Sequence, residues 1–137
     1  MATTYEITVT IRANGRPVTG FPLTRRISCE RFQDVANEHA DDGAHTDLNT
    51  DYLQTYNNVT LTKPKLVFYT ADQLMRFLGV TADAVGNFPL VLDSNGFILA
   101  VGLSTAAAQS YKTSNDIDGI GGDAPTANER IIVAGDD

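Results

Sequence analysis

The segment Thr-Thr-Tyr-Glu-Ile-Thr-Val-Thr-Ile-Arg, residues 3–12, decides the fold class. Every second side chain in it is apolar, namely Tyr5, Ile7, Val9 and Ile11. A period of two is typical of a β-strand with one buried face. Asn14-Gly15 follows directly, and this dipeptide accepts the positive φ angles of a type I′ turn. The start of the chain therefore predicts a β-hairpin.

The returning arm of this hairpin, residues 17–29, alternates less regularly. Arg25 interrupts its apolar row, and Pro17 and Pro22 cannot donate backbone hydrogen bonds. We therefore expect an edge strand or two short strands there.

Further strands are predicted along the rest of the chain. Residues 66–69 are apolar on both faces, which is typical of a central strand. Residues 88–92 and 97–103 flank Asp93-Ser94-Asn95-Gly96 and predict a second hairpin, and residues 130–134 predict a last strand. Residues 1–137 thus predict one mainly β domain, a single antiparallel β-sandwich of the jelly-roll or immunoglobulin-like kind. The expected core is Ile7, Val9, Ile11, Leu66, Phe68, Leu90, Leu92, Leu99, Val101 and Ile132 or its neighbours Ile131 and Val133.

Two regions depart from the strand pattern. Residues 30–56 predict a short helix, from the spacing of Phe32, Val35 and Ala36, followed by long loops, with a polar acidic excursion at residues 33–55. Residues 114–128 are rich in Gly and Asp and predict a loop. Residues 74–78 fit an amphipathic helix best by local pattern alone, although a strand also fits.

Composition excludes several classes of function. The 137 residues carry 17 acidic against 10 basic side chains, so their net charge of −7 disfavours nucleic-acid binding. Cys29 is the single cysteine, which permits no internal disulfide and no thiolate zinc site. No signal peptide or membrane-spanning stretch is recognisable, so we expect a soluble chain made in the cytoplasm.

Two clusters suggest metal ligands. His39 and His45 flank two aspartates, but six residues separate them, which suits one face of neither a helix nor a strand. Asp116, Asp118 and Asp123 suggest calcium, yet the remaining ligands of a calcium loop are missing. We expect both clusters to be solvated loops that bind no metal. Because no catalytic or cofactor-binding motif is present, we expect a non-enzymatic protein without cofactors.

The second half of the sequence resembles the β-sandwich structural proteins of tailed-phage virions, of the capsid-decoration and head-protein type. The resemblance spans residues 66–135 and lies in an order of features. Apolar residues 66–69 run into Thr70-Ala71-Asp72-Gln73 and a short segment ending at Gly79. Next come an apolar segment, a turn and a Gly-containing apolar segment within residues 88–102. Residues 111–115 and a final segment ending in Ala134-Gly135 complete the order. The resemblance implies that residues 74–78 form a strand, and we follow it over the local helix pattern.

This resemblance implies a virion protein that decorates or cements the capsid through surface and edge-strand contacts. Its partner would be the major capsid protein or another virion protein, and the copies would form a homo-oligomer or symmetric array. Arg25 and Arg26 on the edge strand, and Ile131 and Val133 in the terminal segment, are the candidate contacts. The terminal segment is either a core strand or a docking arm. The alternative function is a carbohydrate- or receptor-binding module of a phage tail or fibre, although the chain lacks Trp for sugar stacking.

Overall fold

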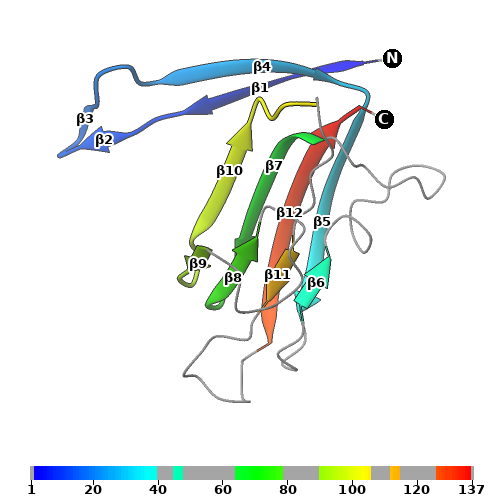
Figure 1. The fold of residues 1–137 in the computed structure, drawn as a ribbon. Coiled ribbons are helices and arrows are strands. Elements are labelled where there is room, and N and C mark those ends of the chain that lie inside the picture. Colours follow the sequence, from blue (N-terminus) through cyan, green and yellow to red (C-terminus); the bar gives the residue numbers. More distant parts are fainter. Residues whose placement is uncertain are drawn as a thin grey trace.

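All regular structure in the described residues is β-strand. The computed structural model describes residues 2–39, 45–47, 64–78, 90–105, 112–114 and 126–136. Figure 1 shows the arrangement of their strands, which are β1 (Thr3–Val9), β2 (Arg12–Ala13), β3 (Arg16–Pro17), β4 (Leu23–Cys29), β5 (Arg31–His39), β6 (His45–Asp47), β7 (Pro64–Ala71), β8 (Met75–Leu78), β9 (Leu90–Leu92), β10 (Phe97–Val101), β11 (Lys112–Ser114) and β12 (Ala127–Gly135).

The beginning of the chain forms a long two-stranded ribbon. β1 pairs with β4 antiparallel from Thr3 opposite Cys29 to Val9 opposite Leu23, and β2 pairs with β3 at the tip. Asn14 and Gly15 join β2 to β3 with φ angles of 51° and 78°, as a type I′ turn requires. The predicted hairpin is confirmed, and of the two alternatives for its returning arm the structure has two strands, β3 and β4.

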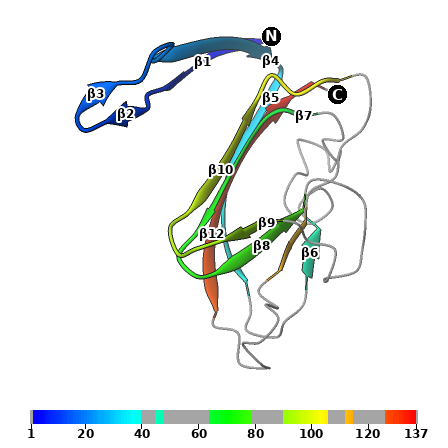
Figure 2. The same cartoon turned by 60° about the vertical axis from the view of Figure 1, so that its left-hand side comes forward.

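The remaining strands form a β-sandwich. One four-stranded sheet, which we call the core sheet, has the order β10-β7-β12-β5, and the other, the cover sheet, has the order β6-β11-β8-β9. Figure 2 shows the two sheets face to face, with the ribbon leaving the core sheet on the side away from the cover sheet. Tyr69 of β7 meets Phe77 of β8 in the layer between the sheets, with ring centroids 5.4 Å apart. The mainly β sandwich is confirmed.

The two central strands of the core sheet are buried because their sequences are apolar on both faces. Val67, Tyr69, Ile131 and Val133 point toward the cover sheet and lie in the larger hydrophobic cluster. On the opposite side of the sheet, Leu66 and Ala134 pack with Cys29 of the ribbon in a second cluster. The prediction of a central strand at residues 66–69 is confirmed.

The helix predicted in residues 30–56 is wrong for the part that the structure describes. β5 runs from Arg31 to His39 and pairs with β12 from Gly135 opposite Arg31 to Ala127 opposite His39. The spacing of Phe32, Val35 and Ala36 suits a helix, but continuous pairing with a buried strand satisfies the backbone of β5 better. The predicted acidic excursion therefore begins inside the sheet, and residues 40–44 and 48–56 lie outside the described residues.

The second predicted hairpin is also wrong as a pairing. β9 pairs with β8 in the cover sheet, whereas β10 pairs with β7 in the core sheet, so the turn between them connects the two sheets. This turn is tied to the core sheet because the backbone N–H of Asn95 donates to the carbonyl of Ala71 at 2.8 Å.

The segment 74–78 forms strand β8 over Met75–Leu78, as the resemblance implies and against the local helix pattern. Two members of the predicted core do not belong to it, because Ile11 is 48% exposed and Leu90 is 47% exposed. Leu90 belongs to β9, the edge strand of the cover sheet, and Ile11 lies between β1 and β2 in the outer part of the ribbon.

Candidate partner-binding surface

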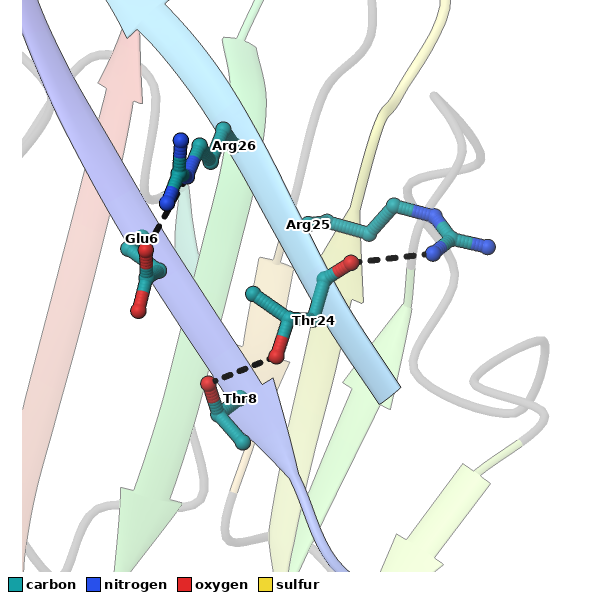
Figure 3. Close-up of polar contacts among 5 residues, drawn as sticks. All are labelled: Glu6, Thr8, Thr24, Arg25 and Arg26. Atoms are coloured by element: carbon teal, nitrogen blue, oxygen red, sulfur yellow. Dashed lines mark hydrogen bonds and ion pairs between the residues drawn. The ribbon is translucent and has the colours of Figure 1, made fainter. Parts of the chain in front are cut away.

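The ribbon has a polar side directed to solvent. Arg26 Nε donates to Glu6 Oε2 at 3.0 Å across the two strands, and the hydroxyls of Thr8 and Thr24 are hydrogen-bonded at 3.0 Å (Figure 3). Cross-strand pairs of this kind stabilise a two-stranded ribbon by a few tenths of a kcal/mol each, up to about 1 kcal/mol. These contacts help to hold the two strands in register.

The other side of the ribbon is apolar near its base and is anchored on the core sheet. Tyr5, Ile7 and Ile27 pack against Leu66 and its neighbours on the outer face of that sheet, the face turned away from the cover sheet. Tyr5 also stacks on Phe32 of β5, with ring centroids 4.9 Å apart. The ribbon therefore covers one half of the outer face of the core sheet.

Beyond this anchor the ribbon has exposed apolar side chains. We call residues 9–25 the distal ribbon. Within it Leu23 is 38% exposed, and Ile11 and Val18 lie opposite each other near the tip, where the Val18 N–H donates to the Ile11 carbonyl at 2.9 Å. Most large apolar side chains of a fold become buried against its own body, whereas Ile11, Val18 and Leu23 of the distal ribbon remain exposed.

Basic side chains are concentrated on the ribbon. Arg25 extends away from the Glu6–Arg26 pair, and its guanidinium donates to the Thr24 carbonyl at 3.0 Å (Figure 3). Within the described part of the chain, no ion pair joins Arg12, Arg16 or Arg25 to a carboxylate. Arginine is enriched at protein interfaces because its planar fork binds carboxylates at two points.

The outer face of the core sheet has a second half that the ribbon does not cover. We call this half the open face, formed by Asp34, Phe68, Thr70, Phe97 and Arg130. Phe97 is 63% exposed, and its ring centroid lies 5.9 Å from that of Phe68. An uncovered aromatic pair bordered by charged groups is the composition typical of a protein interface.

Asp34 and Arg130 form the charged border of the open face. The Arg130 guanidinium donates two hydrogen bonds to the Asp34 carboxylate, at 3.1 and 2.7 Å. These hydrogen bonds lower the pKa of Asp34 and raise that of Arg130. Both groups therefore stay charged at neutral pH and remain available to charged groups of a partner.

The four contact residues predicted from the sequence have different fates. Arg25 and Arg26 are exposed on β4, so both are accessible to a partner. Ile131 and Val133 are 0% exposed in β12, between β7 and β5, so their prediction as contacts is corrected. Of the two interpretations of the terminal segment, the core strand is therefore the right one. The open face was missed, although the apolar residues at alternate positions from Phe97 to Val101 could have indicated it.

A buried polar cluster lies between the sheets. Tyr69 Oη donates to Glu129 Oε1 at 2.6 Å, and Thr113 Oγ1 donates to the same oxygen at 2.9 Å. Glu129 is 2% exposed, and the other two residues are fully buried. Because Glu129 belongs to the core sheet and Thr113 to the cover sheet, this cluster joins the two sheets rather than offering a site to a ligand.

The described residues offer little support for a metal site or for a nucleophilic side chain. Across the described ranges, no group of three or more His, Cys, Asp or Glu side chains is placed to hold a metal ion. Asp116, Asp118, Asp123 and the segment between His39 and His45 lie outside those ranges. Cys29 is buried, and burial raises the pKa of its thiol, which disfavours a reactive thiolate.

The described ranges also contain no helix that is long and apolar enough to cross a membrane. Comparisons with protein-family models, with curated proteins and with solved structures found no match to this chain. Function is therefore inferred from the surfaces described above.

Proposed function

We propose that the protein is a non-enzymatic structural protein of a phage virion, which decorates or cements the capsid. The observation that carries this proposal is the ribbon, which extends from the sandwich (Figures 1 and 2) and whose apolar side chains Ile11, Val18 and Leu23 are exposed. The virion itself enters through the resemblance of residues 66–135 to phage decoration and head proteins.

The distal ribbon gains little stability from contacts with the rest of its own chain. An isolated two-stranded ribbon is marginally stable in water, and each of its strands has an edge of unpaired backbone groups. Such an edge readily adds to a neighbouring sheet or lies along a partner surface. The distal ribbon is therefore best explained as an element that binds another protein in an assembly.

A capsid suits such an element because its surface is repeated. Copies bound on a symmetric shell are held at high local concentration, so modest contacts add up to firm attachment. The partners would be the major capsid protein or another virion protein, and the chain would reach the virion after synthesis in the host cytoplasm. The alternative, a carbohydrate- or receptor-binding module, gains no support from the described residues.

Co-sedimentation tests the proposal. The purified chain is mixed with intact virions and with DNA-free capsids of the phage whose genome carries this sequence, and each pellet is analysed. We expect saturable binding to both kinds of particle. The proposal is overturned if the chain binds neither intact virions nor DNA-free capsids.

A shortened ribbon provides the sharper variant. Because Val9 lies opposite Leu23, residues 10–22 can be replaced by Asn-Gly, which closes the two strands with a type I′ turn. We expect this variant to fold and to bind particles at least about tenfold more weakly, as loss of an interface's anchoring residues does. Thr4→Ala, at an exposed position on the polar side of the ribbon and outside its distal part, is the control and should bind as the unaltered chain does.

A further inference from the structure

We propose that the distal ribbon of one copy binds the open face of the core sheet of a second copy. This inference deepens the proposed function and rests on it only in taking the protein to be an assembly protein. It assigns a partner, a second copy of this chain, and the surface that this copy offers.

The first support is continuity within the apolar surface. The base of the ribbon already covers one half of the outer face of the core sheet, through Tyr5, Ile7 and Ile27. The next positions of the ribbon, Val9 and Leu23, lead away from this anchor, and the adjoining open face begins at Phe68. The apolar side of the distal ribbon and the open face of the core sheet thus both adjoin the buried contact between the base of the ribbon and that sheet.

Geometry prevents a copy from closing this contact alone. Figure 2 shows the ribbon running outward from the upper ends of the core-sheet strands. Phe97 and Thr70 of the open face pair at the other end of β10 and β7, far from the Val101–Leu66 pair that packs on the ribbon. The β1–β4 pairing continues without a register shift out to Val9 opposite Leu23, so the two strands leave the sandwich as one paired ribbon. The distal ribbon therefore reaches the open face of another copy instead of its own.

Charge distribution supports a second copy as the partner. Residues 1–30 contain four arginines and two glutamates, whereas residues 31–137 contain 15 acidic and six basic side chains. A basic ribbon is attracted to an acidic body, and opposite charges steer such partners together. At the open face itself, Asp34 can accept hydrogen bonds from an arginine of the incoming ribbon in addition to those from Arg130.

Symmetry permits a closed assembly. When two copies exchange ribbons reciprocally, the same contact forms twice and gives a two-fold dimer, and a head-to-tail arrangement gives a ring. In both cases each copy uses one ribbon and one open face. Variants that damage either half of the contact should therefore complement each other.

The test uses Leu23→Ser on the distal ribbon and Phe97→Ser on the open face, at 38% and 63% exposed positions that serine can occupy without loss of folding. Analytical ultracentrifugation measures association of each full-length chain. We expect the unaltered chain to form dimers or rings, and each variant alone to associate at least about tenfold more weakly. An equimolar mixture should recover association in part, because each mixed dimer has one intact contact, between the ribbon of Phe97→Ser and the face of Leu23→Ser.

Val91→Ser is the matched control, because Val91 is an exposed apolar residue on the edge strand of the cover sheet, away from the proposed contact. It should associate as the unaltered chain does. The inference is overturned if the unaltered chain is monomeric, if the variants associate normally, or if their mixture stays dissociated. Particle binding is measured separately, so a monomer that binds capsids removes only this inference, and an oligomer that does not bind them removes only the proposed function.

Discussion

Removal of one hydroxyl from the sandwich interior tests the role given to the buried polar cluster. In Tyr69→Phe the aromatic ring and its contact with Phe77 remain, whereas the hydroxyl and its 2.6 Å hydrogen bond to Glu129 are lost. A buried acceptor that loses a hydrogen bond costs about 1–3 kcal/mol. Because Thr113 still donates to the same oxygen, we expect the lower part of this range, about 1–2 kcal/mol.

Urea unfolding followed by circular dichroism measures this change in the free energy of unfolding. Tyr5→Phe is the matched control, because it removes the same atom from a half-buried tyrosine and should change stability by less than about 0.5 kcal/mol. For Tyr69→Phe the loss corresponds to a fall in Tm of roughly 3–8 °C in a chain of this length. If the two variants unfold at the same urea concentration, the cluster does not hold the sheets together.

Three further outcomes are expected. The Lys65 ammonium group, and after it the backbone N–H of Glu30, lower the pKa of Asp136 below its usual 3.8. The stability that Asp136 contributes is therefore complete above about pH 5 and is lost as pH falls through the lowered pKa. In urea unfolding from pH 7 to 2, the unaltered chain should lose more stability than Asp136→Asn. Deletion of residues 129–137 should abolish the β-sheet circular dichroism spectrum, because it removes the fully buried Ile131 and Val133 from the centre of the core sheet. Addition of EDTA should leave Tm unchanged in a thermal melt, whereas a fall of several degrees would reveal a structural metal site.

Much of the fold could be predicted from local pattern. Alternation over residues 3–12 and the Asn14-Gly15 turn specify the ribbon, because strand period and turn chemistry are properties of adjacent residues. Apolar residues on both faces at 66–69 likewise identify a strand covered on two sides. Each of these signals agrees with the environment that the folded chain provides.

The errors arose where pairing partners decide the structure. Residues 31–39 form a strand because β12 satisfies their backbone, and nothing within the segment reveals that partner. Residues 90–101 contain a genuine turn, but the strands on its two sides belong to different sheets. β9 pairs with β8 in the cover sheet, and β10 pairs with β7 in the core sheet. Local periodicity does not distinguish a hairpin from a turn that connects the two sheets of a sandwich.

The candidate surface was predicted only in part for the same reason. Arg25 and Arg26 were found because a charged pair on a proline-marked strand indicates exposure from local sequence alone. The open face joins residues of four strands that are distant in the sequence, and only the sheet register places Phe97 beside Phe68.

The proposed contact with a second copy is consistent with the two-sided pattern of the core sheet. β7 and β12 have apolar side chains on both faces, so the sheet requires a cover on each side. The cover sheet buries the inner face, and the base of the ribbon buries one half of the outer face. The other half is left with the exposed ring of Phe97, while the ribbon extends outward with uncovered apolar residues of its own. In the proposed contact, the distal ribbon of a second copy covers the open face of the core sheet. The same contact buries the exposed apolar side chains of that ribbon.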